Sequence, residues 1–218
     1  MSSRAEGFKS LINLTKWIRV VLYAQIIVAS LAIIFSFLEY RLLADYQAGL
    51  YASLQAAFDY GEITIVLLQG TGIASLIAFV VSAILILQWI YRANYNVRQF
   101  GAQNLSYTPA WSIAYYFIPL FNLWKPYQAM KEIWLASKNP LQWSRGKTAA
   151  VLPVWWALWL CSNLLNQSIF RLSADAKELA ELMNLNLLSQ ISNVLDIALA
   201  IVTLALVSGI CQMQSNQQ

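Results

Sequence analysis

Four long apolar runs divide the chain, and each is long enough to cross a bilayer as a helix. The runs are Trp17–Leu38, Ile63–Tyr91, Thr148–Phe170 and Gln190–Cys211. A hydrocarbon core of about 30 Å takes about 20 helical residues. The pattern therefore predicts an all-α integral membrane protein with four transmembrane helices arranged as two hairpins. We expect a single membrane domain over residues 1–218, made of a first hairpin (1–91), an insertion (92–147) and a second hairpin (148–218).

The links inside the two hairpins are amphipathic. Apolar residues recur at helical spacing in Glu39–Gly61 and again in Arg171–Ser189, which predicts short helices lying on the outer surface. The segments Tyr40–Asp45 and Phe170–Asp175 also resemble each other in sequence. Two interpretations remain open. The hairpins are parallel repeats, as in some transporters, or two amphipathic segments are similar by chance.

The insertion, Arg92–Lys147, has the least ordinary pattern. Its apolar stretch Ala110–Trp124 would be about 22 Å long as a helix, which is short of a full crossing. Pro119 interrupts this stretch and Pro126 closes it, so a straight helix is not expected. Positive charge flanks both ends of the stretch. The pattern therefore predicts a re-entrant or interfacial helical hairpin on the cytoplasmic side.

The segment after Pro126 has the pattern of an interfacial helix. Its apolar face would hold Tyr127, Met130, Ile133 and Trp134, and its polar face would hold Lys131, Glu132 and Lys138. We expect this helix to lie at the membrane surface with its charges in water.

Charged residues are divided unequally between the two ends of the predicted spans. Of fourteen basic residues, eleven fall at one end: Arg4, Lys9, Lys16, Arg19, Arg92, Arg98, Lys125, Lys131, Lys138, Arg145 and Lys147, with only Glu6 and Glu132 among the acids. Seven of ten carboxylates fall at the other end. Basic loops stay in the cytoplasm, so both termini are expected there. Orientation and anionic headgroups account for the pI near 9.1, and we expect no nucleic-acid partner.

Tryptophan follows the same division. Eight tryptophans map near the cytoplasmic interface, with Trp159 one turn deeper: Trp17, Trp89, Trp111, Trp124, Trp134, Trp143, Trp155 and Trp156. One interpretation is an aromatic belt at the interface. The other is an aromatic-walled groove at the inner leaflet for an acyl chain or a partner helix.

The residue types present exclude several kinds of chemistry. The chain has no histidine and only two cysteines, Cys161 and Cys211, which lie far apart. This argues against ordinary zinc sites, His-ligated haem and a histidine general base. There is also no Gly-rich phosphate loop. We therefore expect no enzymatic activity, no metal and no cofactor, although a bound lipid is compatible with the sequence.

Asp196 is the one clear acid inside a predicted span. An ionisable group at that depth is costly and is usually paired or functional. Polar residues on the last two spans are expected to form a seam with it: Asn193, Thr203, Ser162, Asn163 and Asn166. Three roles remain open for this seam. It stabilises helix packing, it binds a cation or relays a proton, or it contacts a partner subunit.

Small residues recur every four positions on the second span, as Gly70, Ala74, Ala78 and Ser82. Such a ladder lets another helix approach closely. That helix is either the first span of the same chain or a helix of another subunit.

The insertion carries the most specific sequence motif. Its residues are Pro109, Trp111, Pro119, Asn122, Trp124, Lys125, Pro126, Tyr127, Glu132 and Trp134. With the preceding Trp89-x-Tyr-Arg-Ala-Asn94, this motif resembles the bacterial membrane family known as domain of unknown function 4328, over roughly Ile84 to Trp159. The resemblance implies a bacterial cytoplasmic (inner) membrane location, with the insertion as the defining feature. It implies no activity, because the family has none assigned.

These observations favour a non-enzymatic accessory, assembly or scaffold subunit of a larger membrane complex. Its expected partners are membrane lipids and other membrane-protein subunits. One alternative is a small transporter or channel that uses the seam at Asp196. A further alternative is a lipid-binding module at the inner leaflet.

Overall fold

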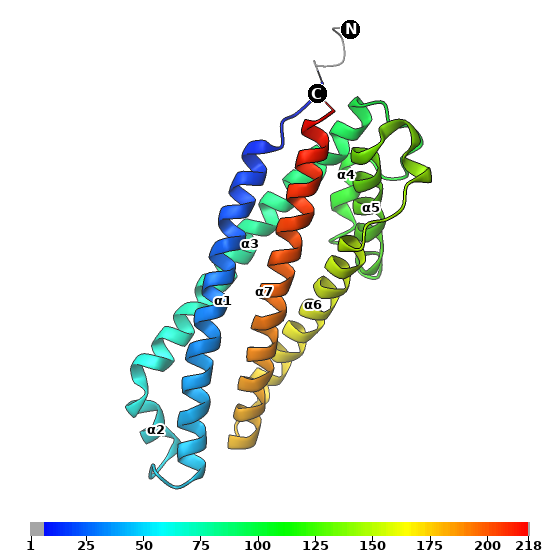
Figure 1. Ribbon diagram of the computed structural model, residues 1–218. Helices are drawn as coiled ribbons and strands as arrows, with labels where there is room; N and C mark the ends of the chain where they lie inside the picture. Colours follow the sequence, from blue (N-terminus) through cyan, green and yellow to red (C-terminus); the bar gives the residue numbers. More distant parts are fainter. Residues whose placement is uncertain (1–6, 218) are drawn as a thin grey trace. The chain divides into compact units, whose positions relative to one another are not determined.

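The computed structural model describes residues 7–217, which are entirely helical apart from turns and loops (Figure 1). The α-helices are α1 (Ile12–Gln47), α2 (Leu54–Tyr60), α3 (Glu62–Gln99), α4 (Pro109–Ala114), α5 (Lys125–Lys138), α6 (Val151–Asp175) and α7 (Leu179–Ser215). Two 3-10 helices, η1 (Phe121–Leu123) and η2 (Pro140–Arg145), lie in the insertion. The predicted all-α class is confirmed. Arg4, Glu6 and both terminal residues of the predicted topology lie outside the described residues.

Three of these helices are long and apolar enough to cross a membrane. They are α1, α3 and α7, of 36, 38 and 37 residues, with mean hydropathies of 2.4, 2.5 and 2.4. This confirms a membrane protein. Within residues 7–217, α6 does not reach the same hydropathy, because its 25 residues include Ser162, Asn163 and Asn166.

The link after the first span differs from the prediction. No separate surface helix covers Glu39–Gly61, because α1 continues to Gln47 and only Leu54–Tyr60 forms a second helix, α2. Gly49 ends α1 with a φ of 79°. Leu50 N donates to Asp45 O and Gly49 N donates to Tyr46 O, at 3.0 Å each. These two bonds form a Schellman motif, in which glycine occupies the left-handed position after the helix.

The same motif ends α3 inside the insertion. Gly101 has a φ of 92°, Ala102 N donates to Val97 O, and Gly101 N donates to Arg98 O. The helix that begins at Glu62 thus runs past Arg92 to Gln99. The predicted boundary at residue 91 therefore falls inside a helix, because neither glycine nor proline occurs between it and Gly101.

The chain forms two compact units. Unit 1 comprises Met1–Leu22, Val80–Ala157 and Ile201–Gln218, and unit 2 comprises Tyr23–Phe79 and Leu158–Ala200. The ranges of unit 1 hold eleven basic and two acidic residues, and those of unit 2 hold three basic and eight acidic residues. Eight of the nine tryptophans also belong to unit 1. The division of charge expected from the sequence thus coincides with a division of the fold.

Several tryptophans of unit 1 belong to its core. Trp89 is fully buried and Trp155 and Trp156 are nearly so, whereas Trp17 and Trp111 are exposed. Trp89 Nε1 donates to the hydroxyl of Thr15 at 3.0 Å, which joins α3 to α1. An aromatic belt therefore accounts for only part of the set.

Two buried amide side chains connect four segments of unit 1. Asn96 and Gln214 are both 0% exposed, and Asn96 Nδ2 donates to Gln214 Oε1 at 2.9 Å. Asn96 also bonds the backbone N–H and C=O of Lys9. Gln214 Nε2 donates to Ala93 O and to Ser137 Oγ. The chain before α1 and helices α3, α5 and α7 are thus held by one amide pair.

In unit 2, Asn186 plays a similar part. Its amide Nδ2 donates to Ser36 O at 2.8 Å and to Glu39 Oε2 at 2.7 Å, which connects α7 to α1. Its Oδ1 accepts a bond from Gln190. One buried amide therefore satisfies polar groups on two helices.

Replacing Gln214 by alanine should destabilise unit 1, because the change leaves Ala93 O, Ser137 and Asn96 without their partner in a buried site. We expect a loss of about 2–3 kcal/mol, measured as a fall of several degrees in the thermal unfolding temperature in detergent. Gln212→Ala is the matched control, since Gln212 is exposed and its loss should leave the temperature unchanged. Equal effects of the two variants would contradict this account.

Candidate functional site

The insertion starts with a short helix held by its own cap. Thr108 Oγ1 accepts a bond from Trp111 N at 3.2 Å, and Pro109 occupies the first turn of α4, where its missing N–H is not needed. The helix ends at Ala114. Within unit 1, α4 lies beside α5 (Figure 1).

The chain then reverses direction at Leu120. This residue has a φ of 68° and a ψ of −52°, and Phe121 N donates to Pro119 O at 2.9 Å. These values define a γ-turn with positive φ, a rare and strained conformation. For a leucine the strain costs roughly 1–3 kcal/mol. The prediction that no straight helix spans Ala110–Trp124 is confirmed, since Pro119 cannot continue a helix.

An aromatic row crosses this reversal. Tyr115 lies 5.8 Å from Tyr107, 5.1 Å from Trp111 and 5.9 Å from Phe121, between ring centroids. Phe121 in turn lies 5.7 Å from Trp124. Edge-to-face and tilted contacts of this kind stabilise aromatic clusters. The row therefore ties α4 and the turn to the start of α5.

The hydroxyl of Tyr116, shortly before the reversal, is buried, and this burial raises its pKa far above the usual value. A bond from another helix supports the reversal itself. Trp156 Nε1 donates to Leu123 O at 2.9 Å, so η1 is bonded to α6. Trp156 is the sixth residue of α6, about 8 Å along that helix from its start.

Glu132 is buried, which differs from the prediction. We expected it on the water-facing side of the helix after Pro126, but it is 8% exposed. Its carboxylate accepts bonds from Ser106 N at 3.0 Å and from Tyr107 N at 3.4 Å. The physical reason is that the loop before α4 covers this side of α5 and leaves two N–H groups that require an acceptor.

The other side of the same loop is held from α3. Arg98 Nη2 donates to Tyr107 O at 2.7 Å and Asn94 Nδ2 donates to it at 3.1 Å. The phenol of Tyr107 donates to Gln128 and accepts a bond from Lys125 Nζ at 3.4 Å. Tyr107 therefore connects α3, α4 and α5 through its backbone, hydroxyl and ring.

The remaining motif residues divide between surface and interior. Pro126 is buried in the first turn of α5, and Trp111, Pro119 and Trp124 are exposed. Four are partly buried: Pro109, Asn122, Tyr127 and Trp134. Helix α5 is buried on more than one side, so it is not the surface helix that we expected.

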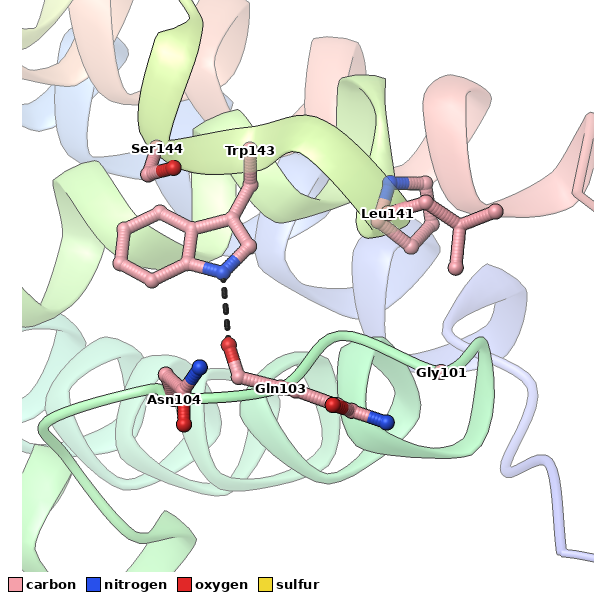
Figure 2. A pocket seen from close by; sticks show the side chains of 7 residues that line it. Gly101, Gln103, Asn104, Leu141, Trp143 and Ser144 are labelled. Atoms are coloured by element: carbon pink, nitrogen blue, oxygen red, sulfur yellow. Dashed lines mark hydrogen bonds between the residues drawn. The ribbon is translucent and has the colours of Figure 1, made fainter.

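Two hollows in unit 1 are lined by residues of the insertion. The first, of about 290 Å³, lies between the loop after α3 and η2, and Trp143 Nε1 donates to Gln103 O across it at 2.9 Å (Figure 2). The second, of about 330 Å³, is lined by Glu132, Lys131 and Tyr107 among others. Trp143 is the tryptophan that lines both hollows. The other insertion tryptophans, Trp111, Trp124 and Trp134, line neither of the two.

The polar seam predicted around Asp196 forms in part. In unit 2, Asp196 of α7 faces Ser162 and Asn166 of α6, and Asn166 Oδ1 accepts a bond from Ser192 at 3.0 Å. Asn163 does not join them, because it is exposed and bonds Trp159 O of its own helix.

Asn193 and Thr203 are the other two residues of the predicted seam on α7. Asn193 donates to Ser189 O within α7. Thr203 is buried in unit 1. The seam in unit 2 thus consists of Asp196, Ser162, Asn166 and Ser192.

The small-residue ladder of α3 does not form a single face. Gly70 is exposed, Ala74 and Ala78 are partly buried, and Ser82 is buried. Four helical residues turn the chain by about 400°, so each step moves the ladder by about 40° around the axis. A Cβ added at Gly70 would meet no atom within 4 Å. The end of the ladder at Gly70 is therefore open.

The fold and the site define a helical membrane protein with a structured insertion between its long helices. The family model described as Domain of unknown function (DUF4328) matches residues 55–212, and the chain belongs to this family. The match is wider than the resemblance seen in the sequence, since it extends from α2 to α7. No curated protein and no solved structure matches the chain.

Replacing Glu132 by alanine should release the loop before α4, because the N–H groups of Ser106 and Tyr107 lose their acceptor. We expect a loss of about 2 kcal/mol and faster hydrogen exchange at these two amides. Glu181→Ala is the matched control. Glu181 also accepts bonds from two backbone N–H groups, but it is exposed and water can replace it. Unchanged exchange at Tyr107 in Glu132→Ala would contradict the proposed role.

Proposed function

We propose that this protein is a non-enzymatic membrane protein that acts as an accessory, assembly or scaffold subunit of a larger membrane complex. In this proposal α6 is a fourth span, since its 25 residues extend about 37 Å. Both termini then lie in the cytoplasm, which agrees with the basic character of unit 1. The proposed location is the bacterial inner membrane.

The observation that carries this proposal is the open surface of α3 at Gly70. Gly70 continues the line of small residues formed by Ala74 and Ala78 along α3, whereas Gly72 lies outside that line. Large apolar side chains on the same helix, such as Ile73 and Ile77, are more than half exposed and suit contact with lipid. Gly70 instead offers bare backbone, which allows a helix of another subunit to approach closely.

Gly70→Leu should abolish a stoichiometric partner complex that survives mild-detergent extraction, because the added side chain separates the two backbones. Native mass spectrometry of the extracted protein measures the loss. Gly72→Leu is the control. Gly72 also has open space around it but points about 200° away around the helix, so its complex should persist. A wild-type protein that extracts with no partner in stoichiometric amount would refute the scaffold role.

A small transporter or channel is the second candidate, and Asp196 favours it. The carboxyl group of Asp196 faces Ser162 and Asn166 between α6 and α7. Oxygen atoms of these three side chains suit a small cation, and the carboxyl group alone suits the transfer of a proton. The same cluster also suits helix packing, so a flux measurement must separate the two.

Asp196→Asn should remove any cation-coupled flux in proteoliposomes, because the amide keeps the shape of the carboxyl group but carries no charge. The thermal unfolding temperature should stay close to that of the wild type. Asn163→Ala supplies a control, since Asn163 is exposed and bonds Trp159 O of its own helix, so the fluxes of this variant should match those of the wild type. If Asp196→Asn leaves proton and cation fluxes unchanged, the transport candidate is to be dropped.

A further inference from the structure

We propose that the γ-turn of the insertion is a wedge that inserts into the acyl-chain region of the inner lipid leaflet. The wedge consists of Phe117, Leu120, Phe121 and Leu123. It is a lipid-binding feature of unit 1 that does not depend on the scaffold role or on the open face at Gly70.

Four large apolar side chains near the turn are exposed. Phe117 and Leu120 are both 71% exposed, and Leu123 and Phe121 are 46% and 42% exposed. The strained backbone of Leu120 projects its side chain at the point where the chain reverses. Strain of this kind persists at sites where it has a use. A leucine in water gains nothing from that position, whereas a leucine in lipid gains its transfer free energy.

Several backbone carbonyls of the wedge are bonded within the chain. Four consecutive carbonyls accept bonds inside the segment: Ile118 O from Asn122 N, Pro119 O from Phe121 N, Leu120 O from Leu123 N and Phe121 O from Trp124 N. Leu123 O and Trp124 O also accept bonds, from Trp156 Nε1 and Gln128 N. In an exposed loop water can satisfy such carbonyls, whereas irregular backbone at membrane depth takes its partners from protein.

The distribution of charge around the wedge also favours lipid. No charged residue occurs between Arg98 and Lys125. The bond from Trp156 places Leu123 beside the second turn of α6. Lys147 precedes the first turn of that helix, so Leu123 lies further along α6 than this charge. Lys125 lies at the base of the wedge, where its ammonium group stands 5.5 Å from the ring of Tyr107. An apolar end with a cation at its base matches the change from acyl chain to headgroup.

Lipid is therefore a better occupant than a protein helix. A docked helix would require a groove of complementary shape, whereas none of the wedge residues lines either of the two hollows in unit 1. Water is the poorest occupant, because four large apolar side chains would be hydrated together.

The test uses a fluorescent reporter on the full chain in phosphatidylcholine–phosphatidylglycerol vesicles. Leu120→Cys is labelled with an environment-sensitive nitrobenzoxadiazole dye in a Cys161→Ser, Cys211→Ser background. We expect blue-shifted emission, with several-fold stronger quenching by acyl-chain spin-labelled lipid than by aqueous iodide. Leu141→Cys is the matched control, since Leu141 is 75% exposed in η2 of the same unit and should respond mainly to iodide.

Phe117→Cys serves as a second reporter on the wedge and covers the case in which the Leu120 variant does not fold. Iodide quenching at Leu120 or Phe117 as strong as at Leu141 overturns the proposal in favour of a wedge in water. Protection of the wedge from both quenchers overturns it in favour of contact with protein.

Discussion

Hydrocarbon and packed protein impose one requirement in common: a polar group placed there must find its partner within the chain. The long helices meet this requirement for their own backbones. In unit 1 the groups that helices leave over are satisfied by Asn96, Gln214 and Glu132. The insertion is thus positioned by hydrogen bonds from side chains on α3, α5 and α7. Apolar contacts around these bonds keep water away from them. Each of these three residues bonds its own helix to at least one other segment of the chain, so we expect its replacement to affect more than one segment at once.

The coarse architecture could be predicted because it depends on properties that sum over many residues. Apolar run length located α1, α3 and α7, and the distribution of basic residues and tryptophans corresponds to unit 1. Helix α6 shows the limit of this approach. Its tryptophans and amides reduce its hydropathy, so that length and composition no longer identify it as a span. Pro119 was informative for a different reason, since proline acts on the backbone whatever surrounds it.

The details of the insertion could not be predicted, because they depend on contacts between distant segments. Gln214 and Gln212 are two residues apart on one helix, and only the neighbours supplied by α3 and α5 bury and bond the first, while the second is exposed. The helical pattern of residues after Pro126 predicts a surface charge at Glu132, because that pattern contains no information about the loop that covers this residue. The positive φ of Leu120 has no local signature either, since leucine rarely adopts it.

The glycine that ends α3 fixes more than the length of that helix. Between Gly101 and the cap residue Thr108 the chain has only six residues in which to leave α3, reach the carboxylate of Glu132 and turn into α4. Because this connection is short, the direction in which the chain leaves α3 determines where α4 begins. One residue gained or lost upstream would rotate the exit point by about 100°, and Tyr107 would then face away from its acceptors. Length variation is accordingly not tolerable within this connection or in the last turns of α3 that lead into it.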